Sequence, residues 1–293
     1  MLSVIESIKA VVVKLLLMFT VIVLAVAAYR WLVLPALQIA FELNEPATAL
    51  LRRLGILLVI LLAYGSYVRF YDKRPVKELH FPVLRVCMGL LSGAGMIALV
   101  SALLFAFGIY EVTAYRGWQT GLLDVALVIL VAAIIEEIVF RAVLFQAMES
   151  QWGTVAALWL QSLIFSLLHI ANLDTQMNTL ALGITVLSGT LIGAFWTILY
   201  VYVRNVWVVA AHHAAWNFTV VLTGLPLSGL SDWQGLAPLQ SVYQGANWLT
   251  GGAVGPEDSV VTIVMVIIAV FAMVWLAQKQ DRFYPAAAAV IKQ

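Results

Sequence analysis

Long apolar runs with few charged residues recur along the whole chain. A helix needs roughly 18 or more such residues to cross the hydrocarbon core of a membrane, and by this measure the pattern predicts about eight membrane-spanning helices. Their expected positions are 15–35, 54–70, 86–109, 121–145, 154–171, 180–203, 206–223 and 259–277. The alternation typical of membrane β-strands is absent, so the expected fold is an all-α, polytopic membrane helix bundle.

Composition supports this prediction. Apolar residues make up 63% of the 293 residues and charged residues only 11%, against about 25% charged in an ordinary soluble domain. This excludes a cytosolic enzyme or a disordered chain and makes the lipid bilayer the expected surroundings. The net charge of +1 excludes a nucleic-acid partner. The single cysteine, Cys87, excludes a disulfide framework and a Cys-based zinc cluster.

Basic residues are distributed unevenly between the two sides of the expected bundle. The loop after the second run and the C-terminal tail hold Arg69, Lys73, Arg74, Lys77, Arg85, Lys279, Arg282 and Lys292. Connections on the opposite side hold Arg52, Arg53 and Arg116, and the long connection 224–258 has neither Lys nor Arg. The positive-inside rule therefore predicts that both termini are cytoplasmic. The first run lacks a small-residue cleavage site, so we expect it to be retained. The compact chain indicates a prokaryotic plasma membrane.

Inserting an ionisable residue into a bilayer costs at least about 2.5–3.5 kcal/mol, so its presence there indicates a structural or functional role. The fourth run contains Glu136, Glu137 and Arg141. Glu137 and Arg141 are four residues apart, so they share a helix face and are expected to pair. Glu136 points about 100° away from Glu137. One carboxylate is thus held by a cation while the other faces different surroundings, an asymmetry that suits a general base.

Histidines also concentrate in the apolar runs, since only His80 of the four lies in a loop. His169 lies at the end of the fifth run, and His213 and Asn217 share one face of the seventh. With the two carboxylates they predict one polar site inside the bundle. The expected boundaries place Glu136 slightly cytoplasmic of the membrane centre and His169 toward the outer side, so we expect helix tilt to bring them together.

Simpler roles exist for each group taken alone. The Glu137–Arg141 pair can be a structural ion pair. A histidine such as His212 can be a hydrogen-bonded core residue, and Asn217 can join two helices. Either helix packing or a groove for a peptide explains three small residues of the sixth run, Gly183, Gly189 and Gly193. The ordered set on three deep helices favours a functional site.

These residues resemble the signatures of the CAAX prenyl endopeptidase and bacteriocin-processing family of intramembrane proteases, also called the CPBP or abortive-infection family. The matching motifs are EEIVFR at 136–141, FSLLH at 165–169 and HAAWN at 213–217, in the order of the family. The resemblance covers roughly residues 121–223, about a third of the chain. Ala142 departs from it, since many members have Gly after the arginine, and this difference concerns helix packing rather than chemistry.

The resemblance implies that Glu136 is the general base that activates a water and that His169 helps to position this water. It also implies that His213 and Asn217 donate hydrogen bonds to the oxyanion of the tetrahedral intermediate. Helix geometry independently leaves Glu136 free of the arginine. Both lines of reasoning therefore choose the same base.

Three further residues have supporting roles in the same comparison. Glu137 is counted among the catalytic residues, and together with Arg141 it supports the other catalytic side chains. Phe165 packs beside His169. The implied activity is that of an intramembrane endopeptidase. It would hydrolyse a peptide bond of a membrane-associated or prenylated protein or peptide.

The family has been described both as metalloproteases and as glutamate-dependent proteases without a metal. A catalytic zinc site usually has three protein ligands and an open position for water, and Glu136, His169 and His213 can supply the three ligands. The sequence lacks the His-Glu-x-x-His helix of zincins. We therefore favour a glutamate-activated water without a cofactor and keep zinc as the alternative.

The expected organisation has three parts. Residues 1–120 form about three N-terminal transmembrane helices, and residues 121–223 form the core that resembles CAAX proteases. Residues 224–293 form an external loop that we expect to pack on the mouth of the bundle, the last helix and a cytoplasmic tail. Two other functions stay open: a proton-coupled transporter, because buried Glu, His and Arg also build proton relays, and a non-catalytic membrane partner protein. The sequence predicts neither the substrate nor an oligomeric state.

Overall fold

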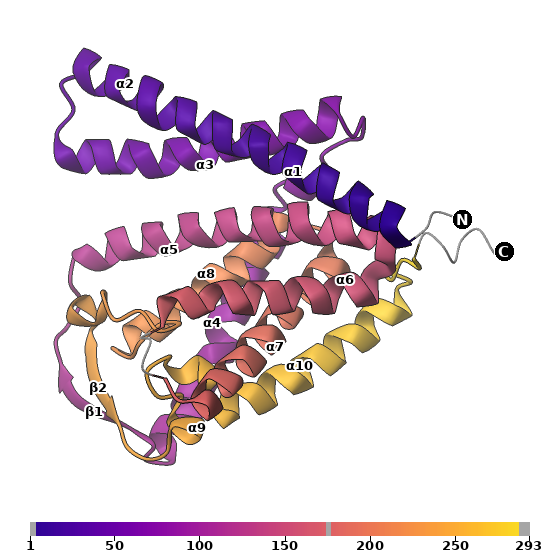
Figure 1. The fold of residues 1–293 in the computed structure, drawn as a ribbon. Coiled ribbons are helices and arrows are strands. Elements are labelled where there is room, and N and C mark those ends of the chain that lie inside the picture. The colour runs from indigo at the N-terminus through magenta and orange to yellow at the C-terminus, as the bar shows by residue number, and fades with distance from the viewer. Residues whose placement is uncertain (1–3, 174–176, 287–293) are drawn as a thin grey trace.

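The computed structural model describes residues 4–173 and 177–286, which form a helical bundle with one small sheet (Figure 1). The helices are α1 Val4–Ala28, α2 Leu34–Ala40, α3 Glu45–Phe70, α4 Val83–Ala106, α5 Gly121–Glu137, α6 Gln146–His169, α7 Thr179–Val203, α8 Val206–Leu222, α9 Asn247–Thr250 and α10 Val260–Lys279. Strands β1 Tyr110–Tyr115 and β2 Leu239–Tyr243 pair antiparallel, with Tyr110 opposite Tyr243. Helix makes up 76% of the structure, which confirms the expected all-α membrane bundle.

Within the described residues, five helical segments are long and apolar enough to cross a membrane: Ile5–Ala40, Glu45–Phe70, Val83–Ala106, Thr179–Val203 and Val260–Lys279. The other three predicted spans correspond to α5, α6 and α8, and α5 and α8 have only 17 residues each. These are the helices that carry Glu136, His169 and His213. The number of membrane crossings stays a prediction.

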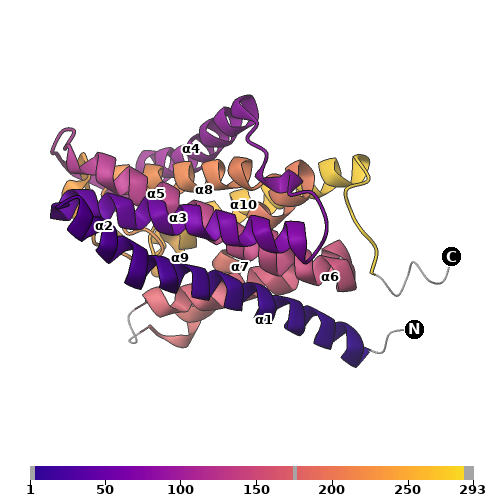
Figure 2. The same ribbon diagram turned by 90° about the horizontal axis from the view of Figure 1, so that it is seen from above.

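The helices are arranged so that α8 lies between α4 and α5, while α6 packs on α7 and α7 packs on α10. The pair formed by α1 and α3 lies along the outside of α5 and α6 (Figures 1 and 2). A π-helical turn, Tyr29–Val33, connects α1 to α2. There the Tyr29 hydroxyl donates to the carbonyl oxygen of Leu51 in α3 at 2.7 Å. This hydrogen bond joins the turn between α1 and α2 to α3.

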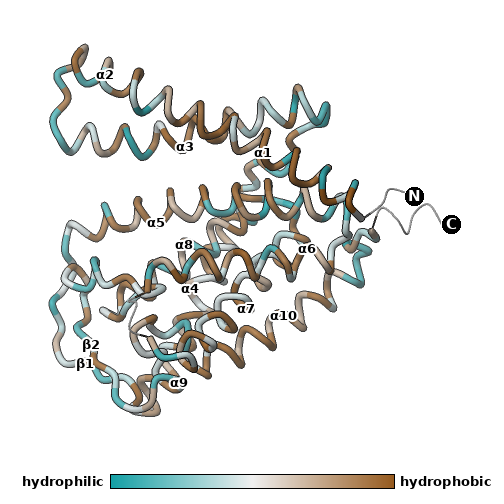
Figure 3. Tube along the Cα trace, viewed as in Figure 1, coloured by the Kyte–Doolittle hydropathy of each residue, from teal (hydrophilic) through white to brown (hydrophobic). Residues whose placement is uncertain are grey.

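Hydrophobic residues follow the lengths of the helices, and hydrophilic residues gather at helix ends and in loops (Figure 3). Many large apolar side chains point outward, among them Leu91, Ile268 and Phe271 at 75%, 63% and 70% exposure. A soluble monomer rarely exposes so much contiguous apolar surface. Lipid contact along the helices explains this surface.

The two ends of the bundle differ in their connections. One end holds the start of α1, the α3–α4 and α7–α8 connections, the turn at Gly153 and the end of α10; we call it the basic end because it carries Lys9, Lys14, Arg69, Lys73, Arg74, Lys77, Arg85, Arg204, Lys279 and Arg282. The other end, the loop end, holds β1, β2 and the long connection from α8 to α10 (Figure 1). The start of α1 and the end of α10 thus lie at the same end.

The turn at Gly153 sets the depth of the expected site; it lies inside α6, whose range Gln146–His169 contains two helices on either side of this glycine. The helix of α5 continues past Glu137 as a π-helical stretch, Ile138–Phe145, and the chain reverses at Gly153, whose φ of 77° suits glycine. Glu136 precedes Gly153 by 17 residues and His169 follows it by 16. Both therefore lie about 24 Å from the turn. Arms of nearly equal length bring Glu136 and His169 to a similar depth, and the expected helix tilt stays a prediction.

Candidate active site

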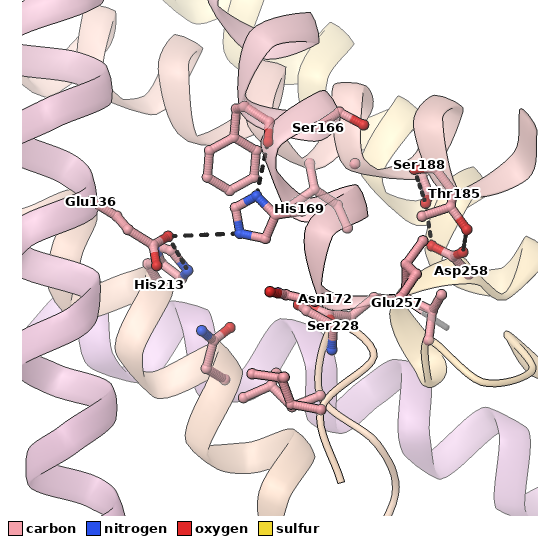
Figure 4. Close-up of a pocket in the computed structure, with 18 of the residues that line it drawn as sticks. Glu136, Ser166, His169, Asn172, Thr185, Ser188, His213, Ser228, Glu257 and Asp258 are labelled. Atoms are coloured by element: carbon pink, nitrogen blue, oxygen red, sulfur yellow. Dashed lines mark hydrogen bonds and ion pairs between the residues drawn. The ribbon is translucent and has the colours of Figure 1, made fainter. Parts of the chain in front are cut away.

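Three side chains from three helices converge between α5, α6 and α8. Glu136 Oε2 lies 4.0 Å from His169 Nε2 and 3.9 Å from His213 Nε2 (Figure 4). Glu136 comes from the last turn of α5, His169 is the last residue of α6, and His213 lies near the middle of α8. The structure thus brings together three of the residues that the sequence placed in one site.

Both imidazole rings are oriented through their other nitrogen. His169 Nδ1 lies 2.8 Å from the carbonyl oxygen of Phe165, and His213 Nδ1 lies 2.9 Å from Glu137 Oε1. A carbonyl or carboxylate oxygen only accepts hydrogen bonds, so each Nδ1 carries the donated proton. Each ring consequently presents Nε2 to Glu136.

Glu137 and Arg141 form a fully buried pair behind these histidines. Arg141 Nη1 donates to Glu137 Oε1 at 3.0 Å, as the i, i+4 spacing predicts, and both side chains are 0% exposed. Arg141 Nη2 donates to the carbonyl oxygen of Gly193 on α7 at 3.0 Å, and the guanidinium lies 5.0 Å from the ring centre of Phe165. Glu137 is therefore shared between Arg141 and His213.

Glu136 has very different surroundings from its neighbour. Its side chain is 33% exposed, and its Oε2 has no hydrogen-bond partner among the described residues. A carboxylate oxygen that lacks a hydrogen-bond partner and has two imidazoles beside it can take a proton from a bound water. Helix geometry predicted this contrast between Glu136 and Glu137.

Asn217 and Phe165 border the same space. Asn217 lines the cavity, and its Oδ1 is buried with no partner among the described residues. The Phe165 ring lies 4.2 Å from the His169 ring, centre to centre. His212 does not line the cavity; it accepts a hydrogen bond from Trp196 Nε1 at 3.2 Å and acts as a core residue.

Trp196 belongs to the site, although sequence reasoning did not select it. Its ring stacks on His213 with a centre separation of 3.7 Å, while its Nε1 donates to His212. One indole thus fixes two adjacent histidines that point in different directions. An aromatic residue inside an apolar helix offers no sequence signal that separates this role from lipid contact.

The residues surround a cavity of about 140 Å³, enough for on the order of ten water molecules. Its walls come from α5, α6, α7 and α8, and its roof comes from the connection between α8 and α10. The roof residues are Leu227, Ser228, Leu230, Trp233, Val254, Glu257 and Asp258. This connection was expected to pack on the mouth of the bundle, and it does.

Two buried acidic residues of the roof were also missed by sequence reasoning. Glu257 accepts hydrogen bonds from the backbone N–H and hydroxyl of Ser228 at 2.7 and 2.6 Å. Asp258 accepts from Thr185 Oγ1 at 2.5 Å and from the Ser188 hydroxyl. Burial raises the pKa of Asp258 to about 6, although both hydroxyl hydrogen bonds lower it. A second adjacent acidic pair in a segment without Lys or Arg was the signal that could have revealed them.

Close contact between α6 and α7 closes one wall of the cavity. A Cβ atom on Gly189 would lie 2.6 Å from Ser166 Oγ, and one on Gly193 would lie 3.3 Å from Phe165 Cδ1. Nothing lies within 4 Å of the corresponding position on Gly183. Helix packing therefore explains Gly189 and Gly193, but not Gly183.

The residues suggested as zinc ligands are spaced widely. Two ligands of one tetrahedral zinc lie about 3.3 Å apart, whereas Glu136 Oε2 is 3.9 and 4.0 Å from the two Nε2 atoms. In the part of the chain that the structure describes, no group of three His, Cys, Asp or Glu side chains has metal-binding geometry. A water at hydrogen-bond distance, about 2.8 Å, from both Oε2 and an Nε2 fits the observed separations. These separations are wider than in a formed zinc site, and we derive no step through a metal.

Residues 117–219 match the family model described as "Rce1-like: Type II CAAX prenyl endopeptidase Rce1-like". No curated protein and no solved structure matches the chain. The matched segment contains α5, α6, α7 and most of α8, and with them Glu136, His169, His213 and Asn217. Over residues 117–219, about a third of its length, the chain is therefore similar to the Rce1-like type II CAAX prenyl endopeptidase family, the family predicted from the three motifs.

Proposed function

We propose that this protein is an intramembrane endopeptidase that hydrolyses a peptide bond with a water activated by Glu136. The substrate is a membrane-associated or prenylated protein or peptide. The observation that carries the proposal is the Glu136 carboxylate, which faces a cavity and has two imidazole Nε2 atoms within 4.0 Å. The family match supports a peptidase of the CAAX type.

The proposed reaction begins with a water bound between Glu136 Oε2 and His169 Nε2. His169 holds this water through its Nε2 lone pair, and Glu136 accepts a proton from it as the water oxygen attacks the peptide carbonyl carbon. The proton then passes to the leaving amine as the C–N bond breaks. Water is consumed, and the products are a carboxylic acid and an amine, which ionise to a carboxylate and an ammonium ion.

Oxyanion stabilisation is assigned to His213 and Asn217. Because His213 Nδ1 already donates to Glu137, a second donation from Nε2 requires the imidazolium form. The Glu137 carboxylate beside Nδ1 stabilises that positive charge, and Arg141 holds the carboxylate in place. Each hydrogen-bond donor to the developing oxyanion raises the rate by about 10²- to 10³-fold.

Peptide cleavage by the reconstituted chain tests the proposal. A quenched-fluorescent peptide library with prenylated members is incubated with wild type, Glu136→Gln and Glu111→Gln, with and without a chelator. Removing a general base lowers the rate by about 10²- to 10⁴-fold, so we expect this loss in Glu136→Gln. Glu111 is exposed on β1, so Glu111→Gln is the matched control and is expected to retain activity.

The incubation with chelator tests whether cleavage requires a metal ion. Cleavage that persists with chelator and disappears in Glu136→Gln supports the glutamate-dependent mechanism. Loss of both cleavage and bound zinc in chelator would instead support a metalloprotease. Full activity of a folded Glu136→Gln protein would remove the assigned base, and proton transport without cleavage would favour the transporter.

A further inference from the structure

The cavity around Glu136 lies in the half of the bundle next to the loop end. Its lining on α6 and α7 includes His169 at the last residue of α6 and Thr185 and Ser188 in the first half of α7. The roof is the connection between α8 and α10. Figure 4 shows Asn172, Ser228 and Glu257 across the cavity from Glu136. All these segments belong to the loop end or to the helix halves next to it.

The opposite side of the cavity is closed by buried residues. Ile138, Arg141 and Phe145, which follow Glu136 toward the basic end, are each 0% exposed. Between α6 and α7, the hydroxyl of Thr197 donates to Gln161 Oε1 at 2.5 Å, and both side chains are fully buried. A separate cavity at the basic end, lined by Arg74, Gln146, Arg204 and others, shares no lining residue with the first. Buried side chains thus separate Glu136 from the basic end of the bundle.

The distribution of Lys and Arg predicts which end of the bundle faces the cytoplasm. Among the described residues, the basic end carries the ten Lys and Arg residues named for it above, whereas the loop end carries Arg30, Arg52, Arg53 and Arg116. The roof segment 224–258 has three acidic residues, Asp232, Glu257 and Asp258, and neither Lys nor Arg. The positive-inside rule places the basic end in the cytoplasm.

Resting on the proposed function, we infer that the scissile peptide bond reaches Glu136 from the extracytoplasmic side of the membrane. The substrates are then exported peptides or the extracytoplasmic ends of membrane segments, not C-terminal peptides presented in the cytosol. The cavity accepts them through a mouth bordered by Asn172 and Ser228. The acidic roof favours segments that carry Lys or Arg near the cleaved bond.

Cysteine labelling tests the side of the mouth without requiring turnover. In a Cys87→Ser background, which removes the only cysteine, Asn172→Cys reports on the mouth and Lys77→Cys on the basic end; both positions are exposed. A membrane-impermeant maleimide applied to intact cells is expected to label Asn172→Cys and not Lys77→Cys. Labelling of Lys77→Cys in intact cells, or labelling of Asn172→Cys only after permeabilisation or not at all, overturns the inference.

Cleavage in sealed vesicles separates this inference from the proposed function. An impermeant, lysine-flanked quenched-fluorescent peptide library is added outside right-side-out or inverted vesicles containing wild type or Glu136→Gln. Polar peptides do not cross the bilayer, so we expect cleavage in right-side-out vesicles and, in inverted vesicles, only after detergent. Cleavage in inverted vesicles without detergent contradicts the sidedness while leaving the peptidase intact. Equal cleavage by Glu136→Gln contradicts the mechanism, whichever side is active.

Discussion

At the scale of single residues, two adjacent glutamates have opposite surroundings. Glu137 is fully buried between Arg141 and His213, whereas Glu136 faces the cavity. The four-residue spacing predicted the pair with Arg141, because such residues are neighbours on a helix surface. It could not predict His213 as the second partner, since His213 lies 76 residues further along the chain. Only the packing of α8 on α5 brings the two together.

The buried pair predicts a large cost for removing one charge. Arg141→Met leaves Glu137 buried with His213 alone, and breaking such a pair costs about 3–5 kcal/mol. We expect the free energy of unfolding in mixed detergent micelles to fall by this amount. Arg85→Met is the matched control, because Arg85 is exposed, and it is expected to change stability by about 0.5 kcal/mol or less.

The double variant Glu137→Gln/Arg141→Met separates charge from packing. It contains no unpaired carboxylate at position 137, so it should recover part of the stability that Arg141→Met loses. If the two single losses simply add in the double variant, the two side chains are not energetically coupled and this account of the pair is wrong.

At the scale of elements, the turn at Gly153 and the contact between α6 and α7 position the site. The hydrophobic runs predict both helices, but they place the end of the fourth run at residue 145 and the start of the fifth at 154. The helix in fact continues to the turn, in part as a π-helix. Periodicity locates apolar segments, but it does not show where a continuous helix reverses, because this depends on one glycine and on the packing around it.

Gly189→Ala is predicted to disturb the cavity wall. The added methyl group would lie 2.6 Å from Ser166 Oγ and 3.1 Å from its Cβ, and overpacking of this kind costs about 1–3 kcal/mol. Gly183→Ala is the matched control in the same helix, since its Cβ meets open space. We expect Gly183→Ala to leave stability unchanged or to raise it by up to about 1 kcal/mol through helix propensity. Melting temperatures in detergent measure both, and an equal effect of the two changes would contradict the close contact.

At the scale of the whole molecule, the connection between α8 and α10 folds back as the roof of the cavity. Trp216 of α8 donates to Glu257 at 3.2 Å, and Thr185 and Ser188 of α7 donate to Asp258. Two carboxylates thus attach the roof to two helices. The sequence predicted a loop that packs on the bundle, but the residues that attach it are far apart in the chain.

Roof attachment should depend on pH through Asp258. Its pKa is raised from 3.8 to about 6 in the folded protein, so between these values the folded state keeps a proton that the unfolded state has lost. Stability therefore falls as the pH rises from about 4 to about 6 and is constant above that range. The asparagine of Asp258→Asn resembles the neutral acid, so the stability of this variant should not show this pH-dependent fall.

The difference in melting temperature between wild type and Asp258→Asn isolates this residue from other carboxylates. We expect the melting temperature of the variant to rise relative to that of wild type as the pH rises from about 4 to about 6. A difference that is the same at pH 4 and pH 7 would show that Asp258 does not titrate between the two states in this way.

The sequence by itself determined the membrane character, the helical class, the Glu137–Arg141 pair and the three family motifs. These depend on composition and on residues within a few turns of one another, where helix geometry is known in advance. Tertiary structure decided which nitrogen of each histidine faces Glu136, how Trp196 contacts His212 and His213, and where the cavity lies. Such features arise between side chains from separate helices, and their distances depend on how those helices pack rather than on any local pattern.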